Sequence, residues 1–206
     1  MSDAPFVLAL DISKTLTGVA EGRVGEKPRA YSLPGKDLSV VAAQAQLFDW
    51  LVDRTKADKI DLLGYEAPLD AGAFRPIVDW EEHTVRSQRD PHTTLVLAKM
   101  TGVVELVGFK RKLRTESINV MTARKEFVGQ ARFKGDEGKK RVRAMVAHLG
   151  WTATNYDQSD AECIWHYCCV LADRNRATII TPSMHARVAT QCGAKTDAPL
   201  LRRVRA

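Results

Sequence analysis

The 206-residue sequence contains no uninterrupted run of about 18 apolar residues and no basic region at its start, so neither a transmembrane helix nor a secretory signal is predicted. Cysteine is scarce, and its 4 residues form no C-x-x-C pattern, which argues against a disulfide framework. Internal repeats and low-complexity tracts are missing as well. We therefore expect one soluble cytoplasmic protein with free thiols and no membrane partner.

Positive charge is concentrated in one segment of the chain. Residues 110–145 hold twelve Lys and Arg against four Asp and Glu, an excess of eight charges, although the whole chain has a net charge of +6. Such a basic block is typical of a protein that binds a polyanion, most often nucleic acid. The alternative is a solvated helical face without a partner.

Short apolar segments bounded by Gly and Pro predict the strands of a sheet. Three follow one another closely, as in an antiparallel meander, at 5–11, 17–24 and 27–33. Two more strands are predicted at 59–66 and 116–122. Apolar residues at helical spacing predict helices at 38–55, 93–109, 135–150 and 158–173, with a short helical turn at 122–129.

This order predicts an α/β fold whose five-stranded mixed sheet has the order 3-2-1-4-5 and is flanked by helices, because right-handed crossovers place strand four beside strand one. Asp11 ends the first strand and Glu66 ends the fourth, so both are expected at the same edge of the sheet. Asp157 and Asp160 share one face of the last helix. If that helix packs against this edge, four carboxylates meet there.

Four carboxylates at contact distance raise one another's pKa and oppose folding unless a cation lies among them. Carboxylate oxygens are preferred ligands of Mg²⁺ and Mn²⁺, and two such ions about 3.5 to 4 Å apart promote in-line phosphodiester hydrolysis. We therefore predict a site for two Mg²⁺ ions, with Mn²⁺ able to substitute, formed by Asp11, Glu66, Asp157 and Asp160. The structural alternative is that Asp157 caps the helix and that the helix dipole stabilises the negative charge of Asp160 near the N-terminus.

Four segments of the chain carry a family resemblance: VLALDISKTLTGVAEG, LLGYEAPL, KKRVRAMVAHLG and YDQSDAEC. In order and separation they resemble the RuvC-type Holliday junction resolvases, especially the phage-like relatives, of the RNase H-like superfamily. The resemblance covers roughly residues 5–173. It implies an RNase H-like fold and a homodimeric crossover junction endodeoxyribonuclease that resolves four-way junctions by paired nicks. The same four acids are its implied catalytic and metal-binding residues.

The resemblance also implies contacts with branched DNA near the helix that precedes the D-x-x-D pair. It assigns this role to Lys125, Lys139 and Lys140. We add three basic residues as candidate DNA contacts, namely Lys14, which follows the first aspartate, and Lys134 and Arg143 of the basic block.

The segment after Glu66 is longer than is usual in the family, and the tail from about 176 to 206 has no assigned counterpart. Residues 67–92 are rich in proline and are interpreted as a functional loop. Relatives carry a junction-probing aromatic residue shortly after the glutamate, and the nearest candidates here are Leu69, Phe74 and Trp80. A general-base histidine within this loop, His83 or His92, is an alternative to a surface role. We predict a nuclease domain at 1–175 and a basic C-terminal extension of unknown structure at 176–206.

Other functions fit parts of the pattern. The chain could be an RNase H-like nuclease acting on RNA or on flap or fork DNA, or a nucleic-acid-binding protein without catalysis. The segment LALDISKTLTGVA also resembles the first phosphate motif of actin-like ATPases, but further Gly-rich phosphate loops are missing. A zinc site on the last helix is less favoured than core packing for Cys163, His166 and Cys169.

Overall fold

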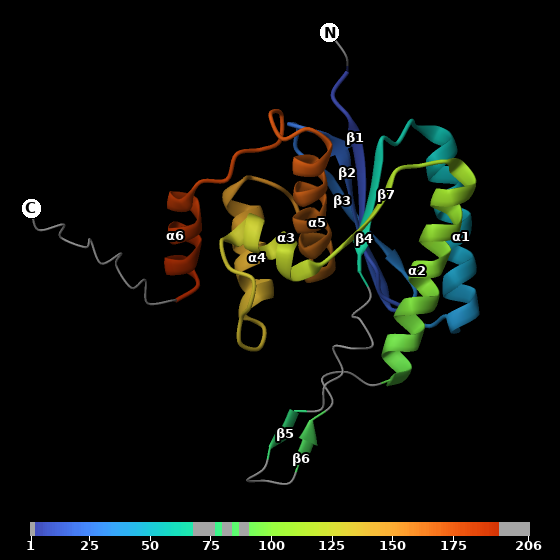
Figure 1. Ribbon diagram of the computed structural model, residues 1–206, viewed down its shortest axis with the longest axis horizontal. Coiled ribbons are helices and arrows are strands. Elements are labelled where there is room, and N and C mark those ends of the chain that lie inside the picture. Colours follow the sequence, from blue (N-terminus) through green and yellow to red (C-terminus); the bar gives the residue numbers. More distant parts are fainter. Residues whose placement is uncertain (1–2, 68–76, 80–83, 87–90, 194–206) are drawn as a thin grey trace, which may run out of the picture.

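A five-stranded mixed sheet forms the centre of the computed structural model, which describes residues 3–67, 77–79, 84–86 and 91–193 (Figure 1). The strands of this sheet are β1 (Phe6–Asp11), β2 (Leu16–Arg23), β3 (Arg29–Pro34), β4 (Leu62–Glu66) and β7 (Thr115–Ile118). Two short strands pair with each other outside this sheet, β5 (Ile77–Asp79) and β6 (Thr84–Arg86).

The observed strand order is β3-β2-β1-β4-β7, which confirms the predicted order. Strand β1 is antiparallel to β2 and parallel to β4, and β4 is parallel to β7. The central place of β1 follows from its composition, because an apolar strand must be covered on both faces. Its residues from Val7 to Leu10 have no exposed surface.

Helices cover both faces of the sheet (Figure 1). One face carries α1 (Val40–Ala57) and α2 (Pro91–Arg111). The other face carries α3 (Val120–Val128), α4 (Glu137–His148) and α5 (Tyr156–Ala172). A last helix, α6 (Pro182–Gln191), packs against α4. None of the described helices combines the length and the apolar character needed to cross a membrane.

Two boundaries differ from the sequence-based expectation. The strand predicted at 116–122 ends at Ile118, because the side chain of Asn119 accepts a hydrogen bond from the backbone N–H of Met121 and starts α3. Within the extension for which we assigned no structure, α6 begins at Pro182, after Thr181 whose side chain caps it, and buries Val188.

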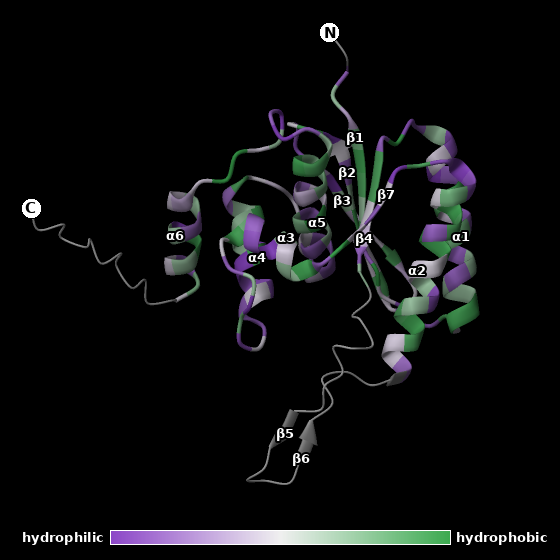
Figure 2. Ribbon diagram, viewed as in Figure 1, coloured by the Kyte–Doolittle hydropathy of each residue, from purple (hydrophilic) through white to green (hydrophobic). Residues whose placement is uncertain are grey.

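The alternation of β1 side chains divides the core into two halves. Leu8 and Leu10 point toward α1 and α2 and pack with Leu51 and Met100. Val7 and Ala9 belong to the opposite half, whose large, fully buried side chains include Phe127, Met145 and Trp165. Figure 2, coloured by hydropathy, shows hydrophobic residues in the central strands and both hydrophobic and hydrophilic residues in the helices around them.

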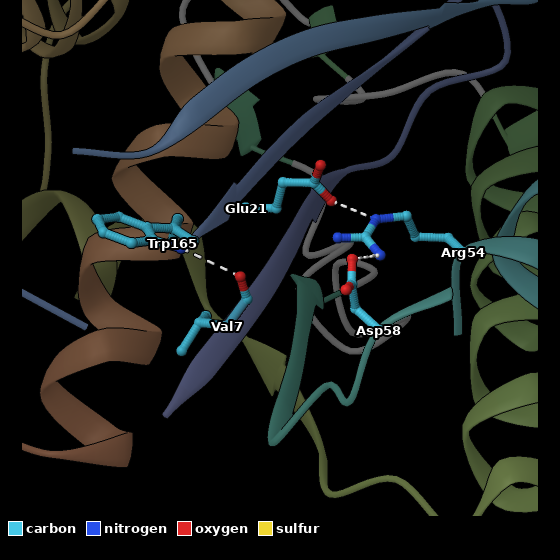
Figure 3. Close-up of polar contacts among 5 residues, drawn as sticks. All are labelled: Val7, Glu21, Arg54, Asp58 and Trp165. Atoms are coloured by element: carbon cyan, nitrogen blue, oxygen red, sulfur yellow. Dashed lines mark hydrogen bonds and ion pairs between the residues drawn. The ribbon is translucent and has the colours of Figure 1, made fainter. Parts of the chain in front are cut away.

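Polar contacts on both faces join the helices to the sheet (Figure 3). On the α5 side, the indole N–H of Trp165 donates to the backbone carbonyl of Val7 over 3.2 Å. On the α1 side, Arg54 Nε donates to Glu21 over 2.6 Å and Nη1 donates to Asp58 over 2.7 Å. Because Glu21 is only 5% exposed, Arg54 is the counter-ion that makes its burial tolerable.

Replacing Arg54 with Leu should lower the free energy of unfolding by about 3 kcal/mol, because it leaves the Glu21 carboxylate buried without its partner. The double variant Glu21→Leu, Arg54→Leu removes both charges and should recover much of that loss. Urea denaturation of the two variants and the wild type measures the difference. Equal stability of the single variant and the wild type would show that the ion pair has no such role.

Candidate active site

Strands β1 and β4 bring the first two acids together. The two strands are parallel neighbours whose register pairs Leu10 with Tyr65, so Asp11 and Glu66 each follow a paired residue at the same edge of the sheet. This edge is the one at which β4 passes into the thin grey trace in Figure 1. The carboxyl ends of parallel strands are the usual location of binding sites in α/β proteins.

Helix α5 brings the other two acids to this edge from its first turns. Its N-cap is Asn155, whose side chain accepts a hydrogen bond from the backbone N–H of Gln158 over 2.9 Å. The alternative that Asp157 caps the helix is therefore wrong, because Asn155 already satisfies that position. The side chains of Asp157 and Asp160 line a cavity instead.

The approach of α5 depends on Gly18, which pairs with Asp11 in the register of β1 and β2. A Cβ atom at Gly18 would overlap the backbone carbonyl of Asp157. Any side chain at this position would therefore push the first turn of α5 away from Asp11. Sequence reasoning missed this role, because a glycine in a strand does not reveal which helix lies over it.

All four predicted acids line one cavity of about 390 Å³, which we call the acidic cavity. Its wall also carries three cationic side chains, Lys14, Arg124 and Lys139. His92 and Thr93 line it from the first turn of α2. The arrangement places a compact group of carboxylates inside a basic rim, and such a rim attracts a polyanion toward the acids.

The acids lie close enough to perturb one another. Burial, the charge of Glu66, a hydrogen bond with Glu66 and the charges of Asp160 and Asp157 all raise the pKa of Asp11 well above its ordinary value. Burial also raises the pKa of Asp160, and the positive charges of Arg124 and Lys139 oppose that shift. The carboxylates therefore repel one another in the folded state, and binding of a proton or a cation reduces this repulsion.

Arg124 forms an ion pair with one of these acids, Asp160. Its Nη2 atom lies 3.4 Å from each carboxylate oxygen of Asp160. The side chains are 20% and 8% exposed, so the ion pair is largely removed from solvent. Sequence reasoning selected the neighbouring Lys125 and missed Arg124, because the family resemblance assigned the DNA contacts to lysines. The helical spacing of Arg124 with buried Phe127 and Val128 was the signal that could have found it.

The chemistry of the donors fits a hard divalent cation, since four carboxylates supply only oxygen ligands and an excess of negative charge. Their positions do not yet form a coordination sphere. Among the described residues, no group of three or more His, Cys, Asp or Glu side chains is placed to hold a metal ion. Asp11 shares a hydrogen bond with Glu66, and Asp160 faces Arg124, so cation binding requires these side chains to turn.

The candidate DNA contacts fall into two groups. Lys14 and Lys139 line the acidic cavity. The others lie outside it on α3, on α4 or between them, with exposed side chains, namely Lys125, Lys134, Lys140 and Arg143. Arg143 donates to the carbonyl of Thr154 and lies over the ring of Tyr156. The candidate junction-probing residues Leu69, Phe74 and Trp80 and the histidine His83 are outside the described residues.

The predicted core role of the three zinc candidates agrees with their environment. Cys163, His166 and Cys169 are buried among the residues that α5 packs against the sheet. His166 Nε2 lies 2.9 Å from the carbonyl of Thr178, so one ring nitrogen has a backbone partner.

Comparison with solved structures finds the same architecture in junction resolvases, although no family model and no curated protein matches the sequence. RuvC of Thermus thermophilus in complex with a Holliday junction substrate matches with a TM-score of 0.62 and 12% identity, over 85% of this chain and 99% of that chain. The yeast mitochondrial Holliday junction resolvase Ydc2 matches with a TM-score of 0.51 and 13% identity, over 93% and 85%. At this identity the likeness shows the fold, which is the RNase H-like α/β fold predicted from the sequence.

Replacing Asp11 with Asn should stabilise the protein at pH 8 in the presence of a chelator. Because the pKa of Asp11 is raised in the folded state, its stabilising protonation is complete below about 3.8 and is lost as the pH rises through the folded-state pKa. The free energy of unfolding of Asp11→Asn should therefore exceed that of the wild type at pH 8, and the difference should shrink toward pH 4.

Thermal unfolding followed by circular dichroism between pH 4 and pH 8 measures this difference. Asp37→Asn is the matched control, because Asp37 is exposed between β3 and α1, lies outside the acidic cavity and should show no such pH-dependent gain. Equal stability of Asp11→Asn and the wild type at pH 8 would contradict the claim that repulsion among the carboxylates destabilises the folded protein.

Proposed function

We propose that the protein is a metal-dependent, structure-selective endonuclease that resolves Holliday junctions or related branched DNA by paired nicking. The observation that carries this proposal is the convergence of Asp11, Glu66, Asp157 and Asp160 on one cavity with a cationic wall. The likeness to a RuvC structure that contains a Holliday junction substrate supports the choice of substrate. In this proposal the chain is a crossover junction endodeoxyribonuclease of the phage-like branch of RuvC-type resolvases.

The four acids are the proposed ligands of two Mg²⁺ ions, for which Mn²⁺ can substitute. When bound, such a pair of ions supplies Lewis-acid catalysis of in-line phosphodiester hydrolysis. The residues of the chain supply the remaining requirements. Asp11 and Glu66 are fixed by adjacent strands, which favours a reproducible geometry, and Asp157 and Asp160 are fixed by a capped helix.

The cations around the acidic cavity are the proposed guides for the DNA backbone. Lys14 lies in the turn after β1, whereas Arg124 and Lys139 come from α3 and α4, so positive charge reaches the cavity from separate segments of the chain. Outside the cavity, Lys125, Lys134, Lys140 and Arg143 continue the positive surface. Contacts of this kind bind phosphates without reading sequence.

The boundaries of the unit follow from the same proposal. Residues 1–175 form the nuclease domain, and residues 176–206 form a basic C-terminal extension of which α6 is the described helix. Since α6 contacts α4, the extension adjoins the proposed DNA-binding surface.

A synthetic mobile four-way junction tests the activity against a flap and a linear duplex of equal length. With Mg²⁺ or Mn²⁺, the wild type should cleave the junction in preference to the other two substrates. Asp11→Asn, Glu66→Gln and Asp160→Asn should each reduce cleavage by ~10²–10³-fold, a typical loss when one electrostatic catalytic group is removed, while junction binding in chelator is retained. Asp37→Asn, at an exposed position that lines neither the acidic cavity nor another described groove, should cleave as the wild type does.

The other outcomes separate the alternative functions. Preference for flap, fork or RNA-containing substrates would indicate another RNase H-like nuclease. Junction binding without cleavage by any metal-loaded wild-type sample would indicate a silent binder, and nucleotide hydrolysis would indicate an actin-like ATPase. Full cleavage by Asp11→Asn would refute the assignment of the site.

The proposed homodimer places a second copy of the chain on the outer face of α1 and α2. A groove of about 360 Å³ on this face is lined by Phe48, Val52 and Leu106, and nearby Phe109 is 81% exposed. Lys110 and Arg111 line one side of the groove, and α1 carries exposed Asp49 and Asp53. An apolar centre flanked by opposite charges is self-complementary, as a two-fold interface requires. Paired nicking also requires two active sites.

Leu106→Glu should convert the dimer into a monomer, because it places a charge at the centre of the apolar groove. Size-exclusion chromatography with light scattering measures the mass, and a junction assay should then show single rather than paired nicks. Ile179→Glu is the matched control, because Ile179 is 79% exposed and lies outside the groove. A wild type that is already monomeric would contradict the proposed interface.

A further inference from the structure

Arg124 is the cationic residue with the closest described contact to the proposed metal ligands. Its guanidinium lies 3.4 Å from both oxygens of Asp160, and both residues line the acidic cavity. Lys139 also lines the cavity, but its side chain is exposed to solvent. Arg124 is therefore the positive partner of Asp160 when no metal ion is bound.

The guanidinium of Arg124 does not use all of its hydrogen-bond donors. Its distance of 3.4 Å to Asp160 is longer than the 2.7–2.9 Å usual for a charge-assisted hydrogen bond. Its Nε atom is buried and has no hydrogen-bond partner among the described residues. An unpaired buried donor is unfavourable, so a movement of Arg124 that brings this donor to a further anion costs less than breaking a fully paired contact.

Helix α4 packs closely against Arg124. Gly138 lies beside it, and a Cβ atom at that position would come 3.0 Å from Phe133 and 3.5 Å from Arg124 Nη1. Neighbouring Arg141 takes no part, because it pairs with Glu137 over 2.6 Å and lies over the ring of Phe133. Arg124 is thus the arginine of this region that faces the acids.

We infer that Arg124 is a built-in counter-ion that occupies Asp160 until a DNA phosphate draws it away, and that the cation and Arg124 compete for the same carboxylate. This inference rests on the proposed function. A carboxylate that faces a guanidinium binds a divalent cation less strongly, because the two positive charges repel each other at short distance.

A phosphate offers the guanidinium a better partner, because planar bidentate contacts with phosphate are strong and directional. Movement of Arg124 to the phosphate frees Asp160 for the cation. Binding of DNA and binding of the cation are thereby coupled, and by linkage each strengthens the other. The consequence is that the site is completed mainly when substrate is present, and Arg124 is a positioning residue that acts through Asp160.

The test compares Mn²⁺ binding by the wild type, Arg124→Gln, Arg124→Lys and Arg187→Gln without DNA, with free Mn²⁺ measured by electron paramagnetic resonance. Arg124→Gln should bind Mn²⁺ more tightly than the wild type, by about 5- to 100-fold, the usual range of coupling between two sites. Arg124→Lys keeps the charge without the planar fork and should show a smaller gain. Arg187→Gln makes the same charge change on the exposed surface of α6 and should bind Mn²⁺ as the wild type does.

Fluorescence anisotropy with a labelled four-way junction in chelator provides the second measurement. Arg124→Gln should bind the junction less tightly than the wild type and Arg187→Gln, because a phosphate ligand has been lost. A role of Arg124 in folding alone predicts weaker binding of both ligands, which would overturn the inference. Equal Mn²⁺ affinity of Arg124→Gln and the wild type would overturn it as well, and so would unchanged junction affinity.

The double variant Arg124→Gln, Asp160→Asn guards against an effect on stability, because it removes both charges of the ion pair. It should show none of the gain in Mn²⁺ affinity, and retention of the gain would overturn the inference. If the wild type and every variant fail to bind Mn²⁺, the proposed metal-dependent function fails, which is a different result from equal binding by the wild type and Arg124→Gln.

Discussion

The close approach of α5 to the sheet is the constraint on which the rest of the structure depends. Gly18 in β2 and Gly64 in β4 flank the central strand, and a Cβ atom at either would overlap α5, at the Asp157 carbonyl and the Cys168 sulfur. Most of the helix is buried, and burial raises the pKa of Glu162, which has no exposed surface, to about 8. Without this close contact, the two aspartates of α5 would not reach the strand ends.

The same contact creates an electrostatic cost. Asp11 lies among three other carboxylates, and the fold relieves the repulsion through a shared hydrogen bond with Glu66 and through the guanidinium that faces Asp160. A site that is satisfied in this manner can fold before a cation binds. It also resists cations that arrive without a substrate, since the local positive partner must first be displaced. The ion pair between Arg124 and Asp160 thus stabilises the fold and also opposes cation binding in the absence of substrate.

The two faces of the sheet are suited to different tasks. The face that carries α3, α4 and α5 presents basic residues next to the acidic cavity, as a surface for DNA requires. The opposite face carries α1 and α2, whose outer surface combines an apolar groove with charges of both signs. Because the groove and the acidic cavity share no lining residue, a contact made at the groove leaves the acidic cavity open.

The sequence by itself determined the strand order and the identity of the four acids that meet. Apolar runs and crossover handedness are local or topological signals, and the residue that ends a strand can be read directly from the chain. Only the tertiary structure decided that Asn155 rather than Asp157 caps α5, that Gly18 admits this helix, and that Arg124 faces Asp160 while Lys125 does not line the cavity. These features depend on distances between segments far apart in the chain, and local periodicity carries no information about such distances.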